Sequence, residues 1–114
     1  MKTIDDLPIE HHERLAIIEA ARLLKERFSA REVILFGSKA RGDDDEESDI
    51  DLLILTALPV SWDERKAIND ALFDIELKHG VVISTRIAID VEWNEGIFPV
   101  LPIHDEISEH GGTA

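Results

Sequence analysis

Hydrophobic residues recur at helical spacing over the first third of the chain. Between Ile9 and Phe28, the apolar side chains of Ile17, Ala21 and Leu24 follow one another at intervals of three and four residues. Because about 3.6 residues make one helical turn, this spacing predicts an amphipathic helix with one face in the core.

Short apolar runs then predict two strands. The run Val33–Phe36 begins with β-branched residues and stops sharply at Gly37, which is typical of a short buried strand. The run Ile50–Leu55 is apolar at almost every position, so both faces of this strand are expected to be buried beyond its start.

A second helix is predicted after the break at Pro59. Ser61 and Glu64 have the spacing of a capping box at a helix start, and Gly80 is placed to end the helix after His79. The residues expected to face the core are Trp62, Ile68, Leu72 and Ile75.

The third predicted strand is Val81–Ile89. Alternation places Ile83, Ile87 and Ile89 on one face and Val82, Ser84, Arg86 and Ala88 on the other. A short helix is expected around residues 103–109, and residues 1–8 and 111–114 are expected to be flexible. This order of elements predicts one small α/β domain over residues 1–114.

The composition fits a folded domain that needs no disulfides. The chain has 114 residues, of which 44% are hydrophobic, and it has no cysteine. No apolar run reaches the roughly 20 residues of a membrane-spanning helix, and residues 1–10 lack the apolar segment of a signal peptide. A cytoplasmic protein without a membrane partner is therefore expected.

The net charge of −13 narrows the class of partner. Nucleic-acid binding draws much of its affinity from basic residues that displace counterions, and here 25 acidic residues oppose 12 basic ones. Tight binding of free DNA or RNA is therefore not expected. The acidity indicates either attraction to basic partner surfaces or a solubility trait alone.

Two motifs, one short loop apart, carry the candidate chemistry. Gly37 and Ser38 follow the first strand directly, where glycine lets the backbone approach a phosphate and a following helix presents free N–H groups. Asp49 and Asp51 open the next strand and point to the same side of it. Neighbouring carboxylates repel one another unless a cation neutralises them, and Mg²⁺ binds through one or two carboxylates plus substrate phosphates. Together the two motifs indicate nucleotide chemistry.

These motifs, from Gly37 to Gly42 and from Ser48 to Leu53, resemble the signature of the DNA polymerase β-like nucleotidyltransferase superfamily. The short chain is most similar to its minimal nucleotidyltransferases. The resemblance implies the palm-like fold of that superfamily, a small mixed β-sheet with flanking helices. It also implies that Gly37 and Ser38 hold the triphosphate of ATP, while Asp49 and Asp51 are catalytic and bind two Mg²⁺ ions.

The resemblance further implies a partner and a reaction. Minimal nucleotidyltransferases similar to this chain often accompany an HEPN-family protein as a toxin–antitoxin pair, so the chain is expected to be the antitoxin and to transfer AMP from ATP to the toxin. Two alternatives stay open. One is an inactive nucleotidyltransferase fold that neutralises its partner by binding alone. The other is a transferase that modifies a small molecule such as an antibiotic; it is less favoured because a second domain is not expected in these 114 residues.

Basic and acidic residues near these motifs have more than one interpretation. Arg41 lies one helical turn beyond Ser38 and is a candidate phosphate contact, but an ion pair with the acidic run Asp43–Glu47 is equally consistent with its position. That run is expected to be a solvated loop, because adjacent loop acids point in divergent directions. Arg86 on the third strand is a further candidate nucleotide contact.

One position departs from the family pattern. Many members carry a third carboxylate on the next strand, as metal ligand and base for the incoming nucleophile, but the candidate position here is Ser84. Three explanations stay open. Asp74, Glu76 or Asp90 substitutes for the missing acid, the substrate provides its own activation, or the protein binds nucleotide without efficient turnover.

Overall fold

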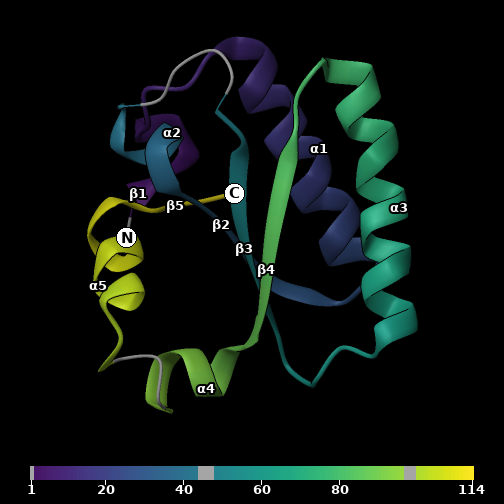
Figure 1. Ribbon diagram of the computed structural model, residues 1–114, viewed down its shortest axis with the longest axis vertical. Coiled ribbons are helices and arrows are strands. Elements are labelled where there is room, and N and C mark those ends of the chain that lie inside the picture. The colour runs from purple at the N-terminus through teal and green to yellow at the C-terminus, as the bar shows by residue number, and fades with distance from the viewer. Residues whose placement is uncertain (1, 44–47, 97–99) are drawn as a thin grey trace.

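A five-stranded mixed sheet forms the centre of the computed structural model, which describes residues 2–43, 48–96 and 100–114 (Figure 1). The strand order is β1-β5-β2-β3-β4. β2 (Ala30–Phe36) and β3 (Ile50–Thr56) are antiparallel neighbours, and β3 pairs in parallel with β4 (Ile83–Ile89). The opposite edge is completed by β5 (Gly112–Thr113) and β1 (Lys2–Thr3).

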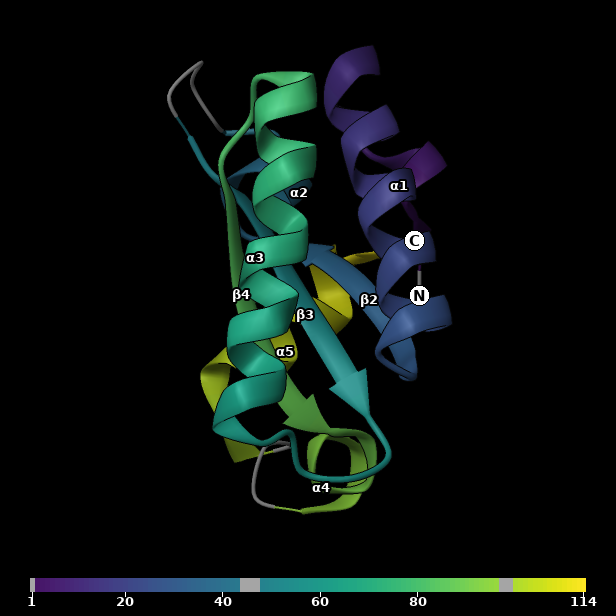
Figure 2. The same ribbon diagram turned by 90° about the vertical axis from the view of Figure 1, so that its right-hand side faces the viewer.

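Helices flank this sheet on both sides, as Figures 1 and 2 show. α1 (His11–Arg27) and α3 (Trp62–His79) pack side by side over one face. α2 (Gly37–Arg41) and α5 (Pro102–His110) lie on the other side, and α4 (Asp90–Glu95) follows β4 directly. A 3₁₀ helix, η1 (Ile4–Asp6), precedes α1. The predicted fold class, a small mixed sheet with flanking helices, is confirmed.

The core has one part on each face of the sheet. The larger part joins α1 and α3 to the sheet through residues such as Ile17, Leu24, Leu52 and Leu72. The smaller part lies on the other face and consists of Ile34, Leu53, Leu55, Ala88, Trp93 and Ile107. β3 is therefore buried on both faces, as its continuous apolar run predicted, and it is a rigid platform for whatever side chains lie at its start.

The predicted second helix begins where its cap was expected but exposes its first residue. The Ser61 hydroxyl accepts a hydrogen bond from Glu64 N (3.1 Å), and Ile68, Leu72 and Ile75 are buried. The expectation that Trp62 faces the core is wrong, because its side chain is 80% exposed. Trp62 is six residues before Ile68, which is not a whole number of helical turns, so it lies off the buried stripe.

The chain ends also differ from the expectation. Residues 111–114 were predicted to be flexible, yet Gly112 and Thr113 pair with both β1 and β2, and Gly112 is buried. Ala114 N donates to the Val33 carbonyl (2.9 Å), and Lys25 Nζ donates to the Ala114 carbonyl (2.7 Å). Residues 2–3 and 112–113 are thus held by β-sheet pairing. Separately, no helix in the described part of the chain combines the length and apolar character needed to cross a membrane.

Candidate active site

The turn at Gly37 lies directly against the Asp51 carboxylate. Phe36, the last residue of β2, pairs with Asp51 of β3, so the chain turns beside that side chain. Gly37 has φ +77°, a left-handed conformation that residues with a Cβ rarely adopt. A Cβ at this position would also lie 2.3 Å from Asp51 Oδ2. Glycine therefore satisfies two requirements here, and it brings the turn into contact with the acidic pair.

Asp49, Asp51 and Ser84 converge beside this turn. Asp51 pairs in register with Ser84 of β4, and the Ser84 hydroxyl donates a hydrogen bond to Asp49 Oδ2 (3.0 Å). An open hollow of about 510 Å³ adjoins them and is lined by Phe36, Asp51, Ser84, Thr85 and Arg86. The predicted register of β4, with Ser84 toward the acidic pair, is the one observed.

The charges around Asp51 favour the binding of a cation. Burial raises the pKa of the Asp51 carboxyl above its ordinary value, and the charge of Asp49 raises that pKa further. Arg86 and Arg41 oppose the shift, whereas Glu106 on α5 adds to it. Since the shift reflects burial and like charge, a bound cation would relieve both costs of ionising Asp51.

This raised pKa predicts a pH-dependent stability effect in the metal-free protein. The folded state binds a proton at Asp51 more tightly than the unfolded state does. The free energy of unfolding therefore falls as the pH rises from the ordinary pKa near 3.8 through the raised pKa of the folded state. At higher pH the free energy of unfolding stays at this lower value. We expect Asp51→Asn to be more stable than the wild type at neutral pH, with the difference shrinking toward about pH 3.

Urea unfolding in EDTA over that pH range would measure this difference. Asp74→Asn is a suitable control, because Asp74 is an exposed acid on α3 and the substitution makes the same change of charge. An Asp51→Asn protein less stable than the wild type at neutral pH would contradict the assigned cause.

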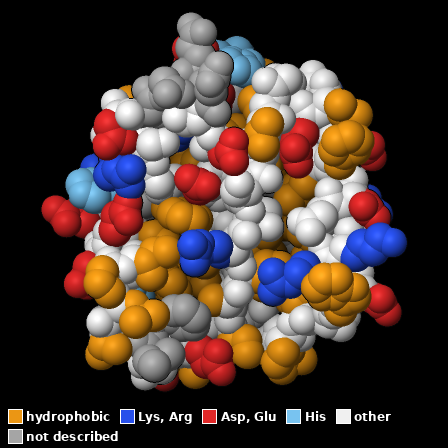
Figure 3. All heavy atoms as spheres, in the orientation of Figure 1, with side chains coloured by type: hydrophobic (Ala, Val, Ile, Leu, Met, Phe, Trp, Pro, Cys, Tyr) orange, Lys and Arg blue, Asp and Glu red, His pale blue; other side chains and the backbone are white. Residues whose placement is uncertain are grey.

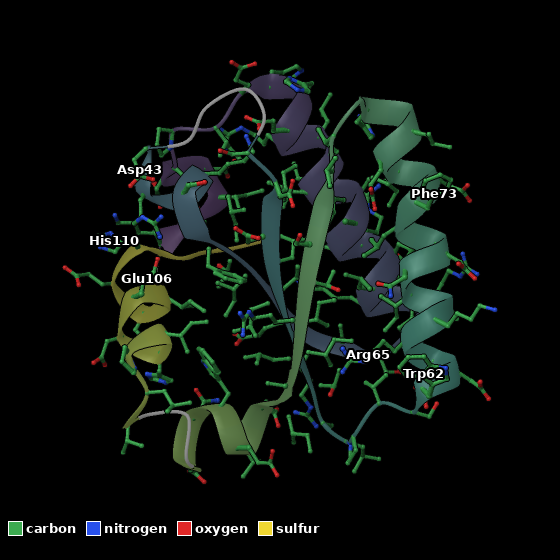
Figure 4. All side chains as sticks on the ribbon, viewed as in Figure 1. Asp43, Trp62, Arg65, Phe73, Glu106 and His110 are labelled. Carbon is green, nitrogen blue, oxygen red and sulfur yellow. The ribbon has the colours of Figure 1, made fainter. Side chains whose placement is uncertain are left out.

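Ser38 and Arg41, both predicted to contact the nucleotide, have different surroundings. The Ser38 hydroxyl is half-buried and forms no hydrogen bond with any described residue. Arg41 forms ion pairs with Asp43 (3.2 Å) and with Glu106 of α5, which Figure 4 shows beside the end of α2. The ion pair with the acidic run is therefore present at Asp43, and residues 44–47 of that run lie outside the described residues. Ser38 is free to bind a ligand, whereas Arg41 would have to share its guanidinium.

A buried ion pair between Lys39 and Glu13 joins α2 to α1. Lys39 and Glu13 are only 4% and 6% exposed, and they contact one another between α2 and the start of α1. The second Glu13 oxygen accepts a hydrogen bond from Glu10 N (3.0 Å) at the same helix start. Because buried charges need well-placed partners, this pair fixes the position of the turn relative to α1.

The candidates for a third carboxylate lie away from Asp51. Asp74 and Glu76 are on α3, which covers the opposite face of the sheet. Asp90 follows the far end of β4 and pairs with Arg31 (3.4 Å). Glu106 acts on Asp51 through its charge, but among the described residues no three acidic, histidine or cysteine side chains gather closely enough to hold a metal.

The residues present nevertheless fit Mg²⁺ that arrives with a nucleotide. Asp49 and Asp51 supply hard oxygen ligands side by side, and their mutual repulsion raises the pKa of Asp51. Mg²⁺ needs only one or two protein carboxylates when phosphate oxygens complete its coordination. The open hollow of about 510 Å³ beside Phe36 and Asp51 leaves room for such a complex.

Comparison with known proteins identifies the family. The family model described as "Nucleotidyltransferase domain" matches residues 17–106, a segment that includes the Gly37 turn and both aspartates. The chain belongs to the nucleotidyltransferase domain family. It is a nucleotidyltransferase, as the two motifs predicted.

Two curated proteins of Methanocaldococcus jannaschii are similar to this nucleotidyltransferase. One is named "Putative protein adenylyltransferase MJ0604" and is 38% identical over 75% of this chain and 83% of its own length. The other is named "Putative protein adenylyltransferase MJ0141" and is 41% identical over 58% of this chain and 65% of its own length.

A solved structure has the same fold. It is described as "Crystal structure of the toxin-antitoxin with AMP-PNP", and it superposes with a TM-score of 0.59 over 91% of this chain and 72% of the other, at 16% identity. At that identity the likeness concerns the fold alone.

Two parts of the site were not found from the sequence. Glu106 is distant from Asp51 along the chain, and no local motif marks it as a neighbour of the acidic pair. Glu13 resembles an ordinary exposed acid at a helix start, although its position three residues after Glu10 is that of a capping residue. Its burial against Lys39 depends on tertiary packing that periodicity does not reveal.

Proposed function

We propose that this nucleotidyltransferase transfers AMP from Mg²⁺-ATP to a hydroxyl of a protein acceptor, and that the acceptor is an HEPN-family toxin for which it serves as antitoxin. The observation that carries the proposal is the contact of the Gly37 turn with Asp51, which places the candidate phosphate-binding turn beside the acidic pair. The names of the two archaeal relatives support a protein acceptor, and the description of the solved structure supports a toxin partner and ATP.

In this proposal the chain positions the nucleotide and leaves the acceptor free to approach. The Ser38 hydroxyl and the backbone amides of the turn bind the leaving phosphates, and Asp49 and Asp51 hold the metal. The metal, when bound, neutralises charge on the reacting phosphate. The acceptor oxygen forms a bond to the α-phosphorus, the bond from that phosphorus to the β-phosphate oxygen breaks, and pyrophosphate leaves with the electron pair. The hydroxyl proton passes to solvent through the open hollow.

The reaction is tested by following the label from ATP. The chain is expressed together with the product of the neighbouring gene and incubated with ATP labelled at the α- or the γ-phosphate, with Mg²⁺ or with EDTA. We expect protein labelling from α-labelled ATP with Mg²⁺ only, accompanied by pyrophosphate. Labelling from γ-labelled ATP would instead indicate a kinase.

A second candidate function follows from Ser84. Serine stands where many family members have an acid, and the other candidate acids lie away from Asp51. A protein of this kind would neutralise its partner by binding alone. Formation of a stable complex without labelling under any divalent metal would favour this alternative.

Removing the Ser38 hydroxyl should weaken ATP binding without unfolding the protein. A hydrogen bond to a charged group contributes about 1.5–3 kcal/mol, so Ser38→Ala should raise the Kd for Mg²⁺-ATP about ten- to a hundredfold. Calorimetry measures the affinity. Ser108→Ala, at an exposed position on α5, should leave the affinity unchanged, and an unchanged Kd for Ser38→Ala would exclude its role in phosphate binding.

A further inference from the structure

Among the described residues, no strand pairs with the outer edge of β4 beside the active-site hollow. β4 is the last strand of the sheet, and no described strand lies beyond it (Figure 1). The Val82 carbonyl accepts a hydrogen bond from Ile50 N (2.8 Å), and backbone groups alternate sides along a strand. Thr85 and Ile87 therefore direct their N–H and C=O groups away from β3. β4 also has no proline and keeps a continuous register, so it lacks two common devices that block edge pairing.

A second hollow continues along the same edge. It measures about 260 Å³ and shares Thr85 and Arg86 with the first. Its other walls include Arg65 of α3, Trp93 of α4 and Ile107 of α5. Because α3 and α5 cover opposite faces of the sheet, this hollow extends from one face of the sheet to the other around the edge of β4. Figure 3 shows hydrophobic surface over this part of the molecule with basic side chains next to it.

Arg65 and Arg86 carry charges that no ion pair among the described residues neutralises, although Arg86 interacts with the charge of Asp51 at longer range. Neither guanidinium forms an ion pair or hydrogen bond with a residue in the described ranges, although the chain has 25 acidic residues. Figure 4 shows that Arg65 extends from α3 beside β4. Two arginines without an ion pair among the described residues, at one hollow, favour a ligand with a carboxylate or a phosphate, and an acidic side chain of the acceptor would supply the former.

The geometry of the proposed reaction, on which this inference rests, determines from which side of the nucleotide the acceptor hydroxyl approaches. Across the sheet the order is Phe36 and the Gly37 turn, then Asp51, then Ser84, then the free edge. Attacking and leaving oxygens lie on opposite sides of the phosphorus in an in-line transfer. With the leaving phosphates at Gly37 and Ser38, the acceptor oxygen must enter from the side of Ser84.

We propose that the acceptor binds the free edge of β4 as an added β-strand. Adjacent strands are about 4.8 Å apart, so a hydroxyl side chain beside Ser84 would lie next to the reacting phosphate. Side chains two residues apart share a face. The acceptor segment therefore carries its hydroxyl beside Ser84, an acidic residue beside Arg86 and an apolar residue beside Ala88, over the second hollow. The acceptor pattern is hydroxyl-x-acid-x-apolar, in either chain direction.

Synthetic peptides test this pattern without requiring turnover. Fluorescent extended peptides of about nine residues carry serine, glutamate and leucine at alternate positions, in both orders. Fluorescence anisotropy measures their binding to the full chain without ATP. Thr85→Pro removes an outward N–H and should weaken binding about tenfold or more, whereas Thr85→Val, which keeps the N–H, should not. N-methylation of the peptide backbone blocks the same pairing independently of any change in the protein.

The charge contact is tested by a double-mutant cycle. Arg86→Gln and replacement of the peptide glutamate by glutamine should each weaken binding about two- to fivefold, with no further loss when combined. Peptide binding that is absent, or that survives both Thr85→Pro and N-methylation, would overturn the added-strand proposal.

A labelling experiment with α-labelled ATP distinguishes failure of the added-strand proposal from failure of the proposed transferase function. Wild-type protein that labels its natural partner should also label the serine peptide but not its alanine counterpart. If the natural partner is labelled and a bound peptide is not, the acceptor role of the edge is wrong. If nothing is labelled, the proposed transferase function fails, while edge-dependent binding would still support the docking surface.

Discussion

Replacing Gly37 by alanine should abolish nucleotidyl transfer while the protein stays folded. The new Cβ would lie 2.3 Å from Asp51 Oδ2, so the turn or the carboxylate must move. The φ of +77° adds strain at the same residue. A displacement of about 1 Å in a catalytic group can cost about a hundredfold in rate. Here the substitution would displace both the turn proposed to bind phosphate and a proposed metal ligand. We therefore expect a loss of at least about a hundredfold, measured as label transferred from α-labelled ATP.

Gly80 offers a matched control for the strain alone. It has φ +67°, but a Cβ there would meet nothing within 4 Å. Gly80→Ala should therefore lose about 1–2 kcal/mol of stability and keep its activity. Equal loss of transfer in both variants would show that general destabilisation, rather than contact with Asp51, causes the defect. Full activity of Gly37→Ala would remove the basis of the proposed site.

The larger elements could be predicted from the sequence because each has its own hydrophobic pattern. α1, α3 and β3 bury continuous or periodic apolar faces, and Ser61 caps α3 as its spacing predicted. The two-residue strands β1 and β5 have no such pattern, because pairing across the chain ends creates them. α4 is also short, and no helix was predicted between the third strand and residue 103.

Some features of the candidate site could likewise be predicted from local sequence, whereas others depend on contacts between distant segments. The two motifs and the face of Ser84 follow from local sequence, since alternation along a strand fixes which side chains share a side. The contact of Gly37 with Asp51 depends on the pairing of β2 with β3, and the effect of Glu106 depends on the docking of α5. Such contacts join distant segments, so spacing along the chain does not reveal them.

Removing both carboxylate charges should stop transfer without weakening the fold. Asp49→Asn with Asp51→Asn keeps side-chain size but removes the charges that would hold Mg²⁺. If the metal contributes about 4 kcal/mol to transition-state stabilisation, its loss reduces the rate about a thousandfold. The substitution also removes the repulsion and burial cost that raise the pKa of Asp51, so the metal-free protein should be at least as stable at neutral pH.

A control variant that loses two negative charges far from the site distinguishes a catalytic role of Asp49 and Asp51 from a long-range effect of net charge. Asp70→Asn with Asp74→Asn removes two exposed acids from α3, on the opposite face of the sheet, and should leave transfer unchanged. Label transfer and urea unfolding are measured on both double variants. Loss of transfer in the Asp49 and Asp51 variant, with unfolding free energy equal to or above that of the wild type, would assign the pair to chemistry. Retained transfer would exclude these two aspartates as the metal ligands.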